Sequence, residues 1–171
     1  MSINNINSLT SPGNFSGKIL QVVNAIKVDT FTTTSTSLVD VTGLTATITP
    51  SSASNTVLVT VSMSLTSTPA TYASNGAILR GATIVGGGTP AGNRGSRTFF
   101  YRNAASAGDG VGVRSFTFLD SPATTSATTY KVQIMTETSG TAAIGYSYAN
   151  DSDFAVGGRL ASTITLQEVA T

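Results

Sequence analysis

Apolar and hydroxyl-bearing residues alternate along much of this chain, most clearly over Thr56–Thr66. One set of alternating positions holds Val57, Val59, Val61, Met63 and Leu65. The other set is filled by Ser and Thr, with Leu58 beside them. A period of two turns one face of a strand toward a core and the other toward solvent or a partner. The pattern therefore predicts a half-buried β-strand.

Similar patterns predict further short strands along the rest of the chain. They lie at Lys18–Val28, Leu38–Val41, Leu44–Thr49, Ala77–Val85 (interrupted at Arg80-Gly81), Arg97–Arg102, Val113–Leu119, Tyr130–Met135, Thr141–Tyr148 and Ala161–Val169. Lys18–Val28 could be read as either a helix or a strand, and its β-branched residues favour a strand buried on both faces. Ser139-Gly140 favours a tight hairpin turn.

Turn clusters such as Pro50–Asn55 and Asp120–Thr128 separate these strands. The count is about nine or ten strands with turns roughly every ten residues, and no amphipathic helix of useful length appears. This spacing predicts an all-β fold, an antiparallel β-sandwich of the jelly-roll type, over residues 18–171.

Residues 1–17 form a separate zone dominated by Asn, Ser, Gly and Pro. Such a composition buries little apolar surface and is typical of an extended arm. We expect a neighbouring subunit to hold this arm. It has neither the basic start nor the apolar core of a signal peptide.

The composition argues against common enzyme chemistry. The chain has no His, Cys or Trp, whereas Ser and Thr supply 51 of its 171 residues. Imidazole and thiol are the groups most used for general-base, nucleophilic and soft-metal chemistry. A structural or binding β-protein is therefore expected, with no enzymatic activity and no catalytic, cofactor-binding or metal-binding residues.

Charged residues make up only 10% of the chain, and the net charge is +1. Soluble domains usually carry about 25% charged residues. We infer that neighbours in an assembly cover much of the surface; the alternative is that Ser and Thr hydroxyls solvate it. The sequence has no dense basic patch of the kind that predicts nucleic-acid binding. No apolar run approaches the roughly 20 residues of a membrane-spanning helix.

Two kinds of motif suggest ligands but have simpler interpretations. Gly86–Gly88 and Gly108–Gly112 are glycine-rich, yet neither is followed by the Lys-Ser/Thr and helix of a phosphate-binding loop. Asp151 and Asp153, next to Asn150, lack the later ligands of a calcium loop. Loop tips and a side-chain-stabilised turn account for them.

A carbohydrate-degrading site is the main catalytic alternative, because paired carboxylates hydrolyse glycosidic bonds. The carboxylates that would have to approach in space are Asp109, Asp120, Glu137 and Glu168. Possible sugar-stacking platforms are Tyr72, Tyr101, Tyr130, Tyr146 and Tyr148. Core packing explains most of these tyrosines.

Four arginines could form a positively charged rim that faces an acidic partner: Arg94, Arg97, Arg102 and Arg114. Solvated arginines at strand ends are the simpler interpretation.

Three segments resemble virion structural proteins of tailed phages, especially marine phages such as cyanophages. They are Asp29–Leu58, Ser115–Gln133 and the closing segment GGRLASTITLQEV at 157–169. The resemblance implies a compact jelly-roll head, similar to the tumour-necrosis-factor-like trimers, that forms a homotrimer on the particle surface. It supplies no catalytic residues, and the chain has no shaft of the kind found in tail fibres.

We therefore expect a capsid decoration or head-fibre protein that cements the capsid surface and binds the major capsid protein through residues 1–17. The alternative is the receptor-binding head of a tail fibre or other appendage, anchored to a tail protein. Host glycan or protein would then contact loops at Gly86–Arg94, Ala104–Gly112 and Ala149–Phe154. A glycan depolymerase is a third class.

Overall fold

The computed structural model describes residues 17–69, 71–102, 111–146 and 158–171 as an all-β chain. The strands are β1 (Ile19–Lys27), β2 (Phe31–Thr33), β3 (Val39–Ile48), β4 (Thr56–Thr68), β5 (Ala73–Arg80), β6 (Thr83–Val85), β7 (Phe99–Arg102), β8 (Gly112–Asp120), β9 (Thr128–Thr136), β10 (Thr141–Ile144) and β11 (Ser162–Val169). Among these residues, no helix is long and apolar enough to cross a membrane.

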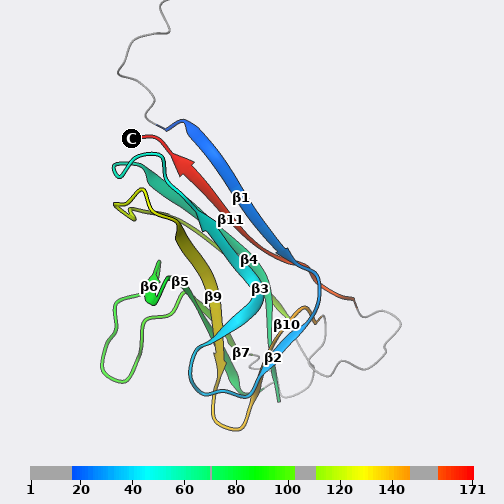
Figure 1. Cartoon of the computed structure of the whole chain (residues 1–171). Helices are drawn as coiled ribbons and strands as arrows, with labels where there is room; N and C mark the ends of the chain where they lie inside the picture. The colour runs from blue at the N-terminus through cyan, green and yellow to red at the C-terminus, as the bar shows by residue number, and fades with distance from the viewer. Residues whose placement is uncertain (1–16, 70, 103–110, 147–157) are drawn as a thin grey trace, which may run out of the picture.

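The strands form two antiparallel sheets that pack face to face (Figure 1). In the first sheet, β1 pairs with β11, β11 with β4, and β4 with β8, while β10 and β2 extend the sheet beyond the start of β11, alongside the end of β4. In the second, β3 pairs with β9 and β9 with β5, and β6 and β7 share the far edge of β5. The predicted antiparallel sandwich is confirmed.

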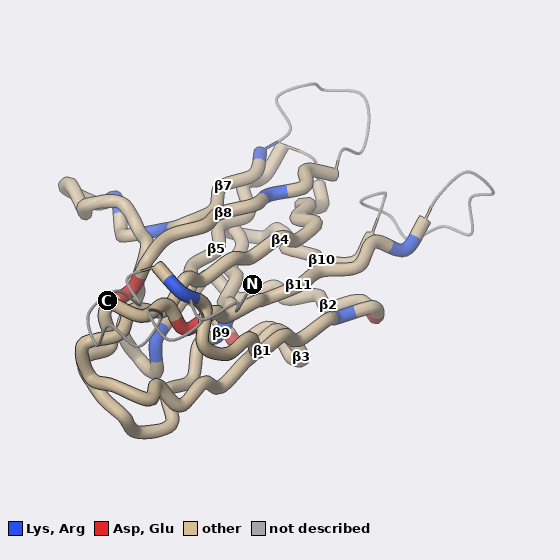
Figure 2. The backbone as a smooth tube through the Cα atoms, turned by 90° about the horizontal axis from the view of Figure 1, so that it is seen from above, with Lys and Arg blue, Asp and Glu red and all other residues tan. Residues whose placement is uncertain are grey.

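The topology is that of a jelly roll. Setting aside the short strands β2, β6 and β10, the first sheet has the order β1-β11-β4-β8 and the second β3-β9-β5-β7. Consecutive long strands mostly alternate between the sheets, as in the double Greek key of jelly rolls. The two sheet edges that carry β7 and β8 lie opposite the edges that carry β1 and β3 (Figure 2).

The core lies between the sheets and follows the predicted alternation. The five apolar residues of β4, from Val57 to Leu65, are completely buried, as are Ile164 and Leu166 of β11 and Tyr130, Val132 and Ile134 of β9. Phe116 and Phe118 of β8 point inward, with ring centroids 5.6 Å apart. These strands were predicted with the correct inward face.

The two ends of the sandwich differ in what they carry. The start of β1, the end of β11, the 49–55 turn and the C-terminus lie at one end, which we call the arm end (Figure 1). The opposite loop end carries the end of β4, the end of β7 and the start of β8. The two ends therefore present different groups to their surroundings.

Several predictions about individual elements were wrong. Eleven strands occur in the described residues, and the two strands predicted at Leu38–Val41 and Leu44–Thr49 form the single strand β3, Val39–Ile48. A register shift between Asp40 and Thr45 takes up Gly43, which has a φ of +88°. Ser139-Gly140 does form a tight turn, but it joins β9 to β10 in the other sheet and makes no hairpin.

The prediction that β1 is buried on both faces was also wrong. Val23 and Ala25 pack against the core, whereas Val22 and Ile26 are 56% and 58% exposed. Among the described residues, the second sheet covers the inner side of the first sheet, and the outward residues of β1 remain exposed. A strand with apolar residues on both faces is thus left half uncovered.

Candidate assembly surface

The outer face of the first sheet carries no charged side chain across its four long strands. Strand register aligns its outward residues in three rows: Val22–Gln167–Leu58–Leu119, Asn24–Thr165–Thr60–Thr117 and Ile26–Thr163–Ser62–Ser115. All twelve residues are exposed or half-exposed. We call this set the uncharged face.

Exposed aliphatic residues gather at the two borders of the uncharged face. Of the eight large hydrophobic residues exposed in the described chain, seven lie on or next to β1 or β8. They are Ile19, Leu20, Val22, Ile26, Val28, Val113 and Leu119. Scattered exposed aliphatics need no explanation, but a contiguous set on one sheet is typical of an interaction surface.

The hydroxyl groups in the middle of the face are partly paired with one another. The Thr60 and Thr117 hydroxyls are 3.1 Å apart, and Ser115 donates to Ser62 at 2.9 Å. Thr165 donates to the Asn24 side-chain oxygen at 3.2 Å. Paired hydroxyls lose less on removal from water than unpaired ones, so a partner can cover this face at modest cost.

A buried carboxylate organises the arm end. Glu168 of β11 is 1% exposed. It accepts hydrogen bonds from the Ser51 amide (2.7 Å), the Ser51 hydroxyl (2.7 Å), Asn55 (2.6 Å) and Gln21 (2.6 Å). These donors tie the 49–55 turn and β1 to β11.

The hydrogen bonds determine the ionisation of this carboxylate. Burial acts to raise the pKa of Glu168, but the donors from Ser51, Gln21 and Asn55 outweigh burial and lower the pKa from 4.5 to about 2. All of these donors are neutral. The group is fully partnered and serves as a structural anchor.

A second polar cluster closes the core at the same end and joins the two sheets. Asp120 of β8 accepts a hydrogen bond from Tyr130 of β9 (2.6 Å) and forms an ion pair with Arg80 of β5 (2.7 Å). Burial and this carboxylate raise the pKa of the Tyr130 hydroxyl. The cluster fixes the ends of three strands.

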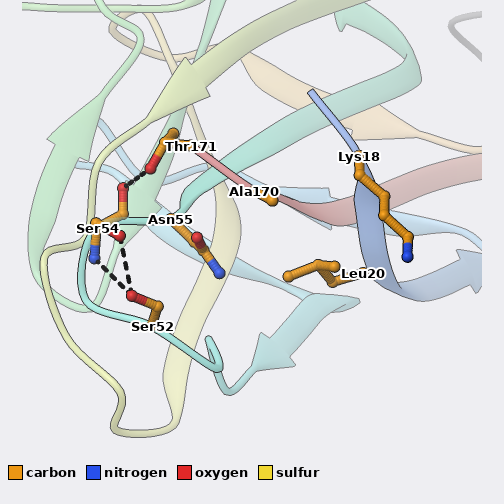
Figure 3. Close-up of a pocket in the computed structure, with 7 residues that line it drawn as sticks. All are labelled: Lys18, Leu20, Ser52, Ser54, Asn55, Ala170 and Thr171. Atoms are coloured by element: carbon orange, nitrogen blue, oxygen red, sulfur yellow. Dashed lines mark hydrogen bonds between the residues drawn. The ribbon is translucent and has the colours of Figure 1, made fainter. Parts of the chain in front are cut away.

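An open groove of about 460 Å³ lies where the polypeptide enters the sandwich (Figure 3). Its lining comprises Lys18, Leu20, Ser52, Ser54, Asn55, Ala170 and Thr171. Gly17 donates its amide to the Ala170 carbonyl at 2.8 Å, and the Ala170 amide donates to Lys18 at 2.9 Å. These bonds extend the β1–β11 pairing, so the arm leaves from a fixed position beside the C-terminus.

Three of the four carboxylates considered for glycoside hydrolysis lie in the described chain, and each has its own hydrogen-bond partners. Glu168 and Asp120 lie on either side of Val57 in the first sheet, each held by its own cluster. Glu137 accepts the Ala73 amide at the loop end, and Asp109 lies outside the described residues. No group of three or more metal-ligating His, Cys, Asp or Glu side chains occurs in the part of the chain that is described.

The tyrosines do not line a common cleft. Tyr101 and Tyr130 belong to the core, and Tyr72 and Tyr146 are only half-buried. The guanidinium of Arg159 lies 5.1 Å from the ring centre of Tyr146. Tyr148 lies outside the described residues, as do the Asn150–Asp153 turn and its Asp151 and Asp153. Core packing therefore accounts for two of the four described tyrosines, fewer than the majority that the sequence predicted.

Two of the three glycines at 86–88, Gly86 and Gly87, are closely packed. A Cβ on Gly86 would lie 2.8 Å from the ring of Phe118, and one on Gly87 would overlap the Ser96 hydroxyl. Gly86 also has a φ of +65°. This connection therefore follows the sandwich closely. The second glycine-rich stretch, 108–112, is described only from residue 111.

Two of the four arginines of the predicted basic rim, Arg94 and Arg97, lie in the connection before β7. The other two, Arg102 and Arg114, lie on β7 and β8. Arg114 donates to the Phe100 carbonyl (3.1 Å), and Arg102 donates to the Thr71 carbonyl (3.0 Å). Arg97 donates to the Ser96 carbonyl at 2.6 Å, and Arg94 lies in a turn closed by Ala91. Within the described chain, none of the four forms an ion pair with a carboxylate.

The sequence did not reveal that the residues of the uncharged face form one surface. The signal was present in the outward residues of single strands, such as Leu58 among the hydroxyls of β4. The twelve outward positions that lack charge become neighbours only through the register of four strands, most of which are distant in sequence. The Glu168 cluster was likewise hidden, because Gln21, Ser51 and Asn55 are at least 113 residues from Glu168.

Comparison with known proteins identifies no family: no family model and no curated protein matches the chain. Among solved structures, 11 chains match. One belongs to the structure of infectious bursal disease virus, Gx strain, with a TM-score of 0.42 and 15% sequence identity. The match covers 91% of this chain and 38% of that one, so this chain spans well under half of that neighbour.

Proposed function

We propose that this chain is a non-enzymatic virion structural protein of a tailed phage, a homotrimer that decorates the capsid surface. The observation that carries the proposal is the uncharged face. A sheet surface bordered by exposed aliphatic residues is unfavourable in water and suited to burial against copies of the same chain. The resemblance of Asp29–Leu58 and Ser115–Gln133 to phage virion proteins supports the particle context.

The size of the uncharged face fits a subunit contact. Four strands spaced by about 4.8 Å, with nine residues rising about 3.3 Å each, span roughly 20 by 30 Å. That area of about 600 Å² is comparable to the roughly 800 Å² that each partner buries in a stable complex. Because the chain has a net charge of only +1, copies repel each other little.

The point at which the polypeptide enters the sandwich supports an anchoring role of residues 1–17. The polypeptide enters the sandwich beside the C-terminus, at the end held by Glu168, and the loop end lies on the far side (Figure 1). A subunit attached through its arm to the major capsid protein would point its loop end away from the particle. Cementing would result because one trimer contacts several capsid subunits.

A receptor-binding head of a tail fibre or appendage is the second candidate. The same polarity favours it, because strands β7 and β8 end or begin at the loop end, where the Ala104–Gly112 connection departs. The Gly86–Arg94 connection instead runs beside the second sheet. Host glycan or protein would contact these connections, and a tail protein would take the place of the capsid.

Two measurements test the proposal. Light scattering of the purified chain should give three times the mass of 17.4 kDa; a monomer at all concentrations would contradict self-association. Deletion of residues 2–17 should leave the trimer intact and abolish binding to undecorated capsids. Retained capsid binding would refute the anchoring role, and labelling confined to the tail would favour the receptor-binding candidate.

A further inference from the structure

The two long sides of the sandwich present different charged groups: arginines on the β7–β8 side, where Arg102 is exposed and Arg114 half-exposed, and carboxylates on the β1–β3 side. On the β7–β8 side, Arg102 and Arg114 have only carbonyl and aromatic partners among the described residues. On the β1–β3 side, the carboxylates of Asp29 and Asp40 are 78% and 55% exposed. The ammonium partner of Asp29, Lys27, is buried, so mainly the carboxylate of that pair reaches solvent.

Both sides also border the uncharged face with aliphatic residues. Leu119 and Val113 of β8 are 60% and 63% exposed, and Phe100 of the adjacent β7 is 57% exposed. Across the sheet, β1 exposes Val22 and Ile26, and Val28 follows it. Each side therefore combines an apolar strip with charged groups: guanidinium groups on one side and, on the other, carboxylates that are more exposed than their ion-paired lysines, Lys27 and Lys131.

We propose that copies of this chain associate head to tail, with the β8 border of one copy against the β1 border of the next. The inference rests on the proposed self-association and specifies its contact. Contact between two β8 borders would bring arginines together, and contact between two β1 borders would bring carboxylates together. The heterologous contact pairs opposite charges, and such contacts close into a ring when the rotation allows it.

The proposed attachment through the arms fixes the direction of the ring axis. All arms reach one particle surface only if every copy places its arm end on the same side, which requires strands roughly parallel to the axis. Residues at equal height along the strands then meet between copies. Register places Val22 and Leu119 in one row, whereas Val113 lies six residues, or about 20 Å, along β8 from Leu119.

The absence of cysteine from the chain allows a clean cross-linking test. The double variant Val22→Cys/Leu119→Cys should give covalent trimers on a denaturing gel after mild oxidation or a short bismaleimide. Disulfides require Cα atoms within about 7 Å, so the matched variant Val22→Cys/Val113→Cys should give far less product. Each single-cysteine variant should remain uncross-linked.

Each other outcome overturns the inference. Covalent dimers from Val22→Cys alone would show an isologous contact, and equal yields from the two double variants would show random collision. If light scattering shows a trimer for Val22→Cys/Leu119→Cys but no cross-link forms, the head-to-tail contact is wrong while self-association stands. If the wild-type chain is monomeric, the proposed self-association itself fails.

Discussion

The two outer faces of the sandwich are built from the same kind of alternating strand but differ in charge. The outer face of the second sheet carries an ion pair between Lys131 and Asp40 (2.9 Å), and Gln133 donates to the same carboxylate (2.6 Å). The uncharged face of the first sheet has no ionisable group in twelve positions. It instead exposes Val22, Ile26 and Leu119.

The difference indicates which face is built to remain in water. Both faces have a paired threonine ladder: the hydroxyls of Thr47 and Thr129 are 2.8 Å apart on the second sheet, and those of Thr60 and Thr117 are 3.1 Å apart on the first. Hydroxyls alone therefore do not distinguish the faces. What distinguishes them is the combination of missing charge and exposed aliphatic borders.

The largest expected effect comes from placing a charge on the uncharged face. Thr117→Arg should weaken trimer formation at least 100-fold, or about 3 kcal/mol, because the guanidinium would be buried without a partner. Sedimentation velocity over a concentration series measures the change.

The matched control is Thr47→Arg on the second sheet. It also replaces an exposed threonine that pairs with another threonine across strands. Its association constant should stay within about threefold of wild type, or about 0.7 kcal/mol. If both variants dissociate equally, the two faces do not differ as described here.

The next effect concerns the carboxylates of the two sheets. Glu168→Ala should lower the free energy of unfolding by about 2–4 kcal/mol, because it removes four hydrogen bonds and leaves the buried Asn55 amide with only the Ser51 hydroxyl, at 3.3 Å, as acceptor. Asp40→Ala should cost less than about 1 kcal/mol, since its ion pair is exposed. Chemical denaturation of both variants measures these losses in the free energy of unfolding. Equal losses would show that the Glu168 cluster is not a structural anchor.

A smaller effect should appear in acid. The folded pKa of Glu168 is lowered to about 2 from 4.5, so its contribution to stability is complete above pH 4.5 and is lost as the pH falls toward 2. Glu168→Gln should therefore show a shallower loss of stability over this range than wild type. Unfolding midpoints at pH 5, 4 and 3 measure the slope; parallel curves would mean that another group is responsible.

The sequence specified the strands and their inward faces better than the relations between strands. Val57 to Leu65 on β4 and Tyr130 to Ile134 on β9 were placed correctly because burial against a single core imposes a period of two. The register shift at Gly43 and the crossing from β9 to β10 depend on local backbone geometry and were missed.

The candidate surface was predictable only in part. The low overall charge indicated that neighbours cover the molecule, but composition does not show which part of the surface they would cover. The apolar residues on both sides of β1 were taken to mean burial on both faces. In the structure one face of β1 packs against the core and the other is exposed, on the surface that we propose is covered in an assembly. Distant strands had to be aligned before this surface could be seen.

Footprinting with a carbene reagent that labels exposed side chains tests the difference between the faces most directly. When the protein is diluted below the concentration at which copies associate, Val22, Ile26 and Leu119 should change from weakly to strongly labelled. Thr45 and Thr47 on the second sheet should stay equally labelled throughout. Constant labelling of the first group, or protection of the second, would contradict the assignment of the uncharged face as the assembly surface.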